Sequence, residues 1–98
     1  MKDLISNINK TFESRIRLGI MSVLSVNESY DFNSLKAALA VTDGNLASHL
    51  KALEEKGMII TNKQFIGRKP NTSYSITDKG LAEFQQHLKA LENLISHQ

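Results

Sequence analysis

The clearest pattern of hydrophobic and polar positions in this chain lies between Thr42 and Gly57. Leu46, Leu50 and Leu53 recur there at the spacing of one helix face. Thr42 is a good N-cap for that helix, and Gly57 can end it in the left-handed conformation. The opposite face carries small, hydrogen-bonding or basic side chains, namely Gly44, Ala47, Ser48 and Lys51, with Asn45 and Ala52 on its flank. Such a face can lie close against another surface; an ordinary solvated face is the alternative.

The N-terminal part of the chain predicts an amphipathic helix over residues 10–26. Its apolar stripe consists of Phe12, Ile16, Ile20, Val23 and Leu24. Leu4, Ile5 and Ile8 precede this stripe at helical spacing. These three residues therefore either begin a helix or form an arm that orders only against a partner.

A short helix is predicted over residues 32–40, just before the segment that starts at Thr42. Asp31 is a plausible N-cap for it, and Leu35 and Leu39 face inward. Val41, in the connection, is predicted to be buried between the two helices. Two short helices joined by such a tight turn form a helix-turn-helix, whose second helix enters the major groove of DNA.

Beyond Gly57 the pattern changes to that of β-strands. Residues 58–66 are rich in β-branched and aromatic side chains, 67–71 contain turn residues including the only proline, and 72–76 alternate. They predict a hairpin with Arg68 and Lys69 at its tip. Two bases solvating an exposed loop are the alternative, but the position directly after a helix-turn-helix favours a binding role.

The last predicted helix spans residues 78–96 and begins after Thr77 as its cap. Its apolar stripe consists of Leu81, Phe84, Leu88, Leu91 and Ile95, with Leu94 adjacent. This stripe is long for the end of a small domain, so we expect its C-terminal part to project past the core. An apolar stripe without an intrachain partner implies a partner chain.

Composition narrows the possible functions further. Ninety-eight residues, 41% of them hydrophobic, make one domain over 1–98. The absence of cysteine excludes disulfides, thiolate metal sites and a cysteine nucleophile. No membrane span or signal peptide is visible, so a cytoplasmic protein is expected. The net charge of +2 is mild, but residues 56–79 carry five bases against one acid, Asp78.

The order helix, helix, second helix of the helix-turn-helix, hairpin, helix is that of an α+β, mostly helical, winged helix-turn-helix with a two-stranded wing and a long C-terminal helix. Residues 42–59 resemble the recognition-helix signature of small prokaryotic winged-helix transcriptional regulators. Residues 65–72 and 74–80 resemble their wing and the start of their last helix. Over residues 10–96 the chain is similar to the compact MarR/ArsR-like group.

This resemblance implies a sequence-specific transcriptional regulator that binds double-stranded DNA as a homodimer, with recognition helix 43–56 in the major groove and wing 66–72 on the backbone or minor groove. The DNA-binding positions that it implies are Thr42, Gly44, Asn45, Ala47, Ser48, His49, Lys51, Arg68 and Lys69. Terminal helices at about 1–26 and 78–96 are expected to form the dimer interface through Leu4, Ile5, Ile8, Phe12, Leu88, Leu91, Leu94 and Ile95. No cofactor is implied, and a small-molecule effector is unknown.

Two other functions compete with this interpretation. One is a winged-helix module that binds proteins without binding DNA, and the other is a metal- or small-molecule-sensing repressor with a pocket at the dimer interface. Glu83 and His87 share a helix face, but a plain surface pair is expected there rather than a metal site. No phosphate-binding glycine loop, paired acids or nucleophile–base set is present, so an enzyme is not expected. His49 is expected to be a packing or phosphate-side residue.

Overall fold

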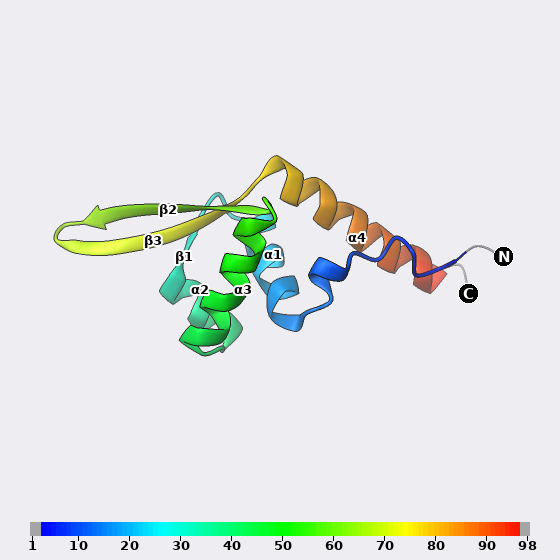
Figure 1. Ribbon diagram of the computed structural model, residues 1–98, viewed down its shortest axis with the longest axis horizontal. Helices are drawn as coiled ribbons and strands as arrows, with labels where there is room; N and C mark the ends of the chain where they lie inside the picture. The colour runs from blue at the N-terminus through cyan, green and yellow to red at the C-terminus, as the bar shows by residue number, and fades with distance from the viewer. Residues whose placement is uncertain (1–2, 97–98) are drawn as a thin grey trace.

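The computed structural model describes residues 3–96 and has the predicted α+β winged helix-turn-helix architecture (Figure 1). A short 3-10 turn at Lys10–Phe12 precedes α1 (Arg15–Ser25), β1 (Tyr30–Asp31) and α2 (Phe32–Leu39). Helix α3 (Asp43–Glu55), β2 (Ile59–Ile66), β3 (Lys69–Ile76) and α4 (Asp78–Ser96) follow. The molecule is elongated, 59 × 25 × 21 Å, because the wing projects at one end and α4 at the other.

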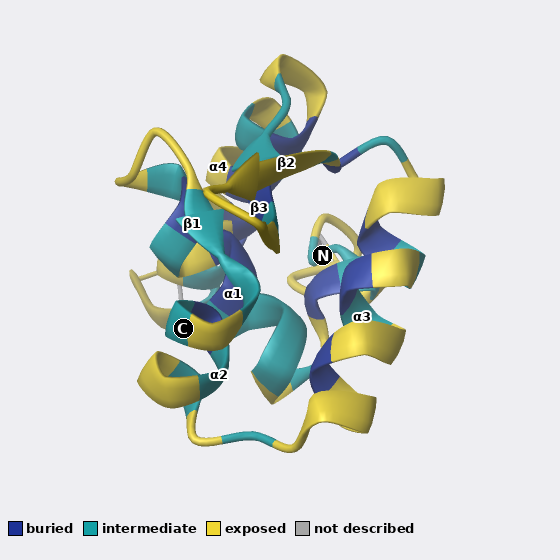
Figure 2. Ribbon diagram, turned by 90° about the vertical axis from the view of Figure 1, so that its left-hand side faces the viewer, coloured by how far each residue is buried: buried dark blue, intermediate teal, exposed yellow. Residues whose placement is uncertain are grey.

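The hydrophobic core lies between α1, α2, α3 and the inner end of the wing (Figure 2). Helix α1 contributes Ile20, Met21 and Leu24, all of them fully buried. Helix α3 contributes its predicted leucine stripe, Leu46, Leu50 and Leu53, which is buried as well. Burial of these leucines fixes which face of α3 is left for solvent or a partner.

The helix-turn-helix connection is short and locally determined. Thr42 is the N-cap of α3, and its Oγ1 accepts a hydrogen bond of 3.2 Å from the Asn45 amide. Val41 is partly buried against the core, as predicted. Ala40 ends α2 in the left-handed conformation with φ 52°, a strained backbone for a residue with a Cβ. An exposed ion pair of 2.8 Å between Lys36 and Asp43 spans the turn.

The sheet has three strands in the order β1-β3-β2, although the sequence indicated only two. Strand β1 consists of Tyr30 and Asp31, which pair with Tyr74 and Ser73 of β3. Two residues carry no readable alternation, and their partners lie more than forty positions away. The wing itself, β2 and β3, is paired along its whole length from Ile59↔Ile76 to Ile66↔Lys69.

The wing turn is shorter than predicted. Strand pairing continues to Ile66 and resumes at Lys69, so the loop has two residues, Gly67 and Arg68, rather than five. Gly67 has φ 66°, which suits the first position of a two-residue hairpin loop. Pro70 is tolerated in β3 because β1 pairs only with Ser73 and Tyr74, so β3 has a neighbour on one side at Pro70.

Helix α3, β2 and α4 meet at a junction organised by Gly57 and Thr77. Gly57 takes φ 74°, as predicted, and the bonds Gly57 N–Glu54 O and Met58 N–Leu53 O close a Schellman motif. Thr77 Oγ1 donates to the Gly57 carbonyl at 2.7 Å and accepts from the Gly80 amide at 2.9 Å. The predicted cap of α4 is therefore also a link between the wing and the end of α3.

The predicted helix over 10–26 was too long at its N-terminal end. Helix α1 begins only at Arg15, because Ser14 takes an extended conformation and its side chain caps the helix by accepting from the Arg17 amide. Phe12 belongs to the preceding 3-10 turn. Residues 4–9 form turns and bends rather than a helix, and residues 1–2 lie outside the described part of the chain.

Candidate nucleic-acid interface

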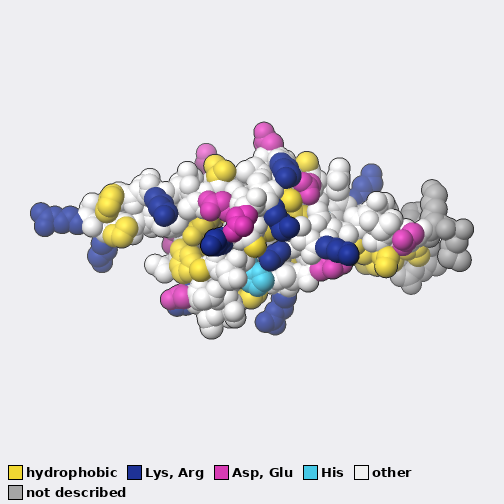
Figure 3. Space-filling view, in the orientation of Figure 1, with side chains coloured by type: hydrophobic (Ala, Val, Ile, Leu, Met, Phe, Trp, Pro, Cys, Tyr) yellow, Lys and Arg dark blue, Asp and Glu magenta, His cyan; other side chains and the backbone are white. Residues whose placement is uncertain are grey.

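The outer face of α3 is exposed along most of its length (Figure 2). The structure leaves exposed the predicted positions Thr42, Gly44, Asn45, Ala47, Ser48 and Lys51. The same side of the molecule shows basic side chains recurring from the wing tip past α3 toward α4, with acidic side chains among them over the middle of the molecule (Figure 3). The opposite face of α3 is fixed by its buried leucines, and Lys51 is the largest exposed side chain between Thr42 and Lys51.

Gly44 is not required by the fold. It lies in the first turn of α3, its φ is not positive, and an added Cβ would meet no atom within 4 Å. Glycine in a helix costs about 0.5–1 kcal/mol relative to alanine. No contact within the chain explains why Gly44 is glycine despite this cost. Close packing of another molecule against the helix backbone at Gly44 would explain it.

His49 lies on the inner flank of this face. It is partly buried, and its Nδ1 accepts a hydrogen bond of 3.0 Å from Arg17 Nε of α1. The side chain therefore faces α1 rather than the outer surface, in line with the expected packing or phosphate-side role. Arg17 keeps its remaining guanidinium donors for another acceptor. Arg17 is not predictable from the sequence as part of this surface, because no local pattern connects it with a histidine 32 residues away.

A hollow of about 250 Å³ lies between α3 and the wing and is lined by both. Its lining includes Ala47, Lys51 and Glu54 of α3 and Lys63, Thr72 and Tyr74 of the wing. Burial raises the pKa of the Tyr74 hydroxyl, and the Glu54 carboxylate raises it further. Lys51 and Lys63 line the same hollow as Tyr74. The hollow joins the outer face of α3 and the wing into one continuous surface.

The wing tip is exposed and basic. Arg68 and Lys69, the two predicted wing contacts, both lie in or beside the two-residue loop and are exposed. Eight-residue strands reach about 26 Å, so these bases lie well beyond the core. They are free to contact a second element of a ligand that α3 also binds.

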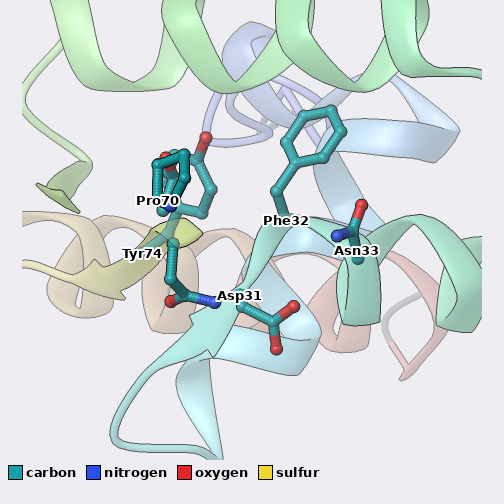
Figure 4. A pocket seen from close by; sticks show the side chains of 7 residues that line it. Asp31, Phe32, Asn33, Pro70 and Tyr74 are labelled. Atoms are coloured by element: carbon teal, nitrogen blue, oxygen red, sulfur yellow. The ribbon is translucent and has the colours of Figure 1, made fainter. Parts of the chain in front are cut away.

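A second hollow, of about 210 Å³, lies between the N-terminus of α2 and the wing (Figure 4). Phe32 and Asn33 line one side and Pro70 and Tyr74 the other, with Asp31 nearby. It is open and mostly polar, unlike the enclosed apolar pockets of about 300–1,000 Å³ that hold small molecules. The hollow therefore gives no support to an effector site.

Most of the residues predicted for dimerisation lie at the α4 end of the molecule. Leu4, Ile5, Leu88 and Ile95 are exposed, whereas Ile8, Leu91 and Leu94 are partly buried. Phe12 differs: its side chain is only 2% exposed and packs edge-on against Phe84 at 5.6 Å. The prediction that Phe12 lies at an interface is therefore wrong, because the 3-10 turn directs it into the chain's own core.

The prediction that Glu83 and His87 form a plain surface pair is also wrong. His87 is 3% exposed, and its Nδ1 accepts from the Asn9 amide at 3.0 Å. Glu83 accepts from Asn9 Nδ2 at 3.2 Å. The two side chains hold the N-terminal segment against α4. Within residues 3–96, no group of three or more acidic, His or Cys side chains could hold a metal ion, and no helix is long and apolar enough to cross a membrane.

Comparison with known proteins gives consistent results. Residues 16–95 match the family described as winged helix DNA-binding domain. The chain is 42% identical over 79 residues to the uncharacterised protein MJ0432 of Methanocaldococcus jannaschii, covering 81% of this chain and 86% of that protein. A solved structure of a transcriptional regulator homologue from Pyrococcus horikoshii OT3 is 32% identical, with TM-score 0.85, and covers 96% of this chain and 91% of that one.

Bacillus subtilis PadR, solved in complex with operator DNA, shares the fold. Its TM-score is 0.69 at 17% identity, and the match covers 76% of this chain and 48% of PadR. At that identity the comparison establishes the fold alone.

Proposed function

This chain belongs to the family of winged helix DNA-binding domains, and from that premise we propose that it acts as a homodimeric regulator that recognises specific sequences in double-stranded DNA. The family and fold are those of DNA-binding transcriptional regulators rather than of enzymes. In the proposal, residues 1–98 act as one domain, with α3 in the major groove and wing 66–72 on the backbone or minor groove.

The observation that carries the proposal is the outer face of α3. Between Thr42 and Lys51 its exposed side chains, apart from Asp43, are small, polar or basic, and they include a glycine that the fold does not need; the acids Glu54 and Glu55 follow at the C-terminal end of the helix. Asn45 and Ser48 hydrogen-bond base edges, and Lys51 contacts a guanine or a phosphate. Each good bidentate base contact contributes about 1–3 kcal/mol of discrimination. Thr42, at the N-terminus of α3, and Ala47 lie against the groove wall.

Basic side chains around this face supply the affinity that does not depend on sequence. Arg17, held by His49, and Arg68 and Lys69 of the wing each neutralise one phosphate. Replacing Arg68 by alanine removes two phosphate contacts from a dimer, so the slope of log K against log salt should become shallower by about 1.8. An unchanged slope would remove the wing from the interface.

The dimer is supported by the α4 end of the molecule. Leu88, Leu91 and Ile95 lie on one face of α4, and Ile95 is 77% exposed. Beyond Phe84, α4 buries His87 and Ala90, whereas Leu88 and Ile95 on its other face stay exposed. A hollow of about 360 Å³ between Asn7 and α4 adds a concave surface at the same end. Pairing of two such ends covers the apolar side chains of Leu88, Leu91 and Ile95.

Sedimentation velocity tests the dimer directly. We expect wild type to sediment as a dimer and Leu88→Glu/Ile95→Glu as a monomer, because the charges cannot be buried in a paired surface. Val26→Glu is the matched control, since Val26 is 80% exposed but lies at the end of α1. A monomeric wild type at micromolar concentration would refute the dimer without affecting the DNA contacts.

Selection from a random duplex library tests sequence specificity. The proposal predicts recovered sites with two inverted half-sites centred about 34 Å apart, one turn of the double helix. Selection with Ser48→Ala should relax one base position in each half-site. Recovery of no consensus would favour the alternative function, a protein-binding module that does not use DNA.

A further inference from the structure

The tip of the wing carries apolar side chains that no other described part of the chain covers. Phe65 and Ile66 are 73% and 63% exposed. Apolar side chains stand beside basic ones at this end of the molecule (Figure 3). Because folding leaves Phe65 in water, the fold gains nothing from an aromatic ring there. The ring is thus available to a binding partner.

Strand register places Phe65 on the side of the wing that faces α3. Side chains alternate across a strand, and residues paired across an antiparallel ladder share a face. Thr61 and Lys63 line the hollow against α3. Phe65 shares their face, together with its cross-strand partner Pro70. Ile66 points to the reverse face.

The wing extends from α3 in the direction of a neighbouring DNA groove. Lys63 lies level with α3 at the hollow, and Phe65 lies two residues further out, about 7 Å along the strand. The loop at Gly67 is about 13 Å beyond Lys63. A major groove and the adjacent minor groove are about 17 Å apart, half a helical turn. With α3 in the major groove, the wing stands across the hollow from α3 and directs its tip toward that minor groove.

The positive charge of the wing indicates that the partner of its tip is a polyanion. Residues 57–77 include Lys63, Arg68 and Lys69 and no acidic residue. A second copy of the wing would repel these bases, whereas the phosphates on both sides of a minor groove attract them. The apolar ring then faces the floor of the groove, between two phosphate contacts.

We propose that Phe65, backed by Pro70, inserts between base pairs in the minor groove and bends the DNA. This inference rests on the proposed function. Minor-groove proteins that insert Phe, Leu, Ile, Met or Pro unstack a base step and kink the duplex by about 20–90°. Pyrimidine–purine steps open most easily, so a TA or CA step should lie beneath each wing.

Two measurements on one DNA duplex test whether Phe65 acts as a wedge between base pairs. A mixed-sequence duplex rich in TA steps carries a fluorescence donor and acceptor at its ends, and permanganate detects unstacked thymines. Wild type should raise energy transfer and create reactive thymines. Phe65→Ser should lose both effects and bind on the order of tenfold more weakly. Ile66→Ser, similarly exposed but on the reverse face, should keep both effects.

The outcomes separate this inference from the function on which it rests. If wild type binds in a salt-dependent way without bending the DNA or creating reactive thymines, insertion of Phe65 is refuted and the proposed DNA-binding function stands. The same holds if Ile66→Ser loses both effects as fully as Phe65→Ser does. No salt-dependent binding by wild type overturns both. If Phe65→Ser changes only self-association in sedimentation, the tip contacts a second copy and the wedge is overturned. Phe65→Leu keeps an apolar side chain and should keep the bend, which controls for misfolding of the serine variant.

Discussion

Replacing Gly44 by alanine should raise the stability of the protein and lower its affinity for DNA. The two effects have separate causes. Gly44 has helical backbone geometry and open space around its missing Cβ, so alanine fits the folded chain without strain. On the DNA, the same methyl group occupies the position at which the proposed partner approaches the helix backbone.

The size of each effect follows from the position of Gly44. Glycine costs about 0.5–1 kcal/mol in a helix, and the lower value applies in the first turn. A gain of about 0.5 kcal/mol raises the melting temperature of a domain of this size by about 2–4 °C. Overpacking a fitted contact costs about 1–3 kcal/mol, which weakens DNA binding by roughly fivefold to a hundredfold for each half-site of the proposed dimer.

Gly57→Ala is the matched control for stability. Gly57 has φ 74°, and only the Lys79 side chain, at 3.7 Å or more, is near an added Cβ. Alanine there should cost about 1–2 kcal/mol through backbone strain alone. Thermal unfolding and fluorescence anisotropy on a selected duplex measure both variants. A stabilised Gly44→Ala that binds as tightly as wild type would refute the close approach of DNA at Gly44.

Three further predictions concern the supporting structure. Ala40→Gly should stabilise the protein by about 0.5–1 kcal/mol in urea unfolding, because it relieves a φ of 52°; a loss of stability would contradict this explanation. Thr77→Ala should cost about 2 kcal/mol, about 1 for the cap and about 1 for the Gly57 carbonyl left without its donor, and Thr77→Ser should recover most of it in thermal unfolding. Burial lowers the pKa of His87, with Glu13 opposing the shift, so the unfolded chain binds the proton more readily. Stability should therefore be complete above about pH 6.5 and fall as the pH drops below it. In urea titrations across this range, His87→Gln should flatten that decline; an unchanged profile would assign it to other groups.

The elements that sequence predicted well are those with local determinants. Helix α3 is defined by Thr42 at its start, Gly57 at its end and three leucines between them, all within sixteen residues. The wing was likewise indicated by a change of period and a glycine turn. The same locality made the outer face of α3 predictable, because burying the leucines leaves only one face exposed.

What the sequence did not predict depends on contacts between distant residues. Strand β1 exists because Tyr30 meets Tyr74, and His87 is buried because Asn9 donates to it from 78 positions away. A local signal was available for the start of α1: Ser14 is a good N-cap inside the periodic run. Apolar spacing from Phe12 to Ile16 concealed it.

The most direct test of DNA recognition by α3 is anisotropy on a mixed-sequence duplex at two salt concentrations, with Ser48→Glu/Lys51→Glu as the variant. Both substituted positions are exposed, so the variant should fold as wild type does by circular dichroism. We expect wild type to bind at low salt and to weaken steeply as salt rises, and the variant not to bind. No binding by wild type at low salt, or equal binding by the variant, would contradict DNA recognition by α3.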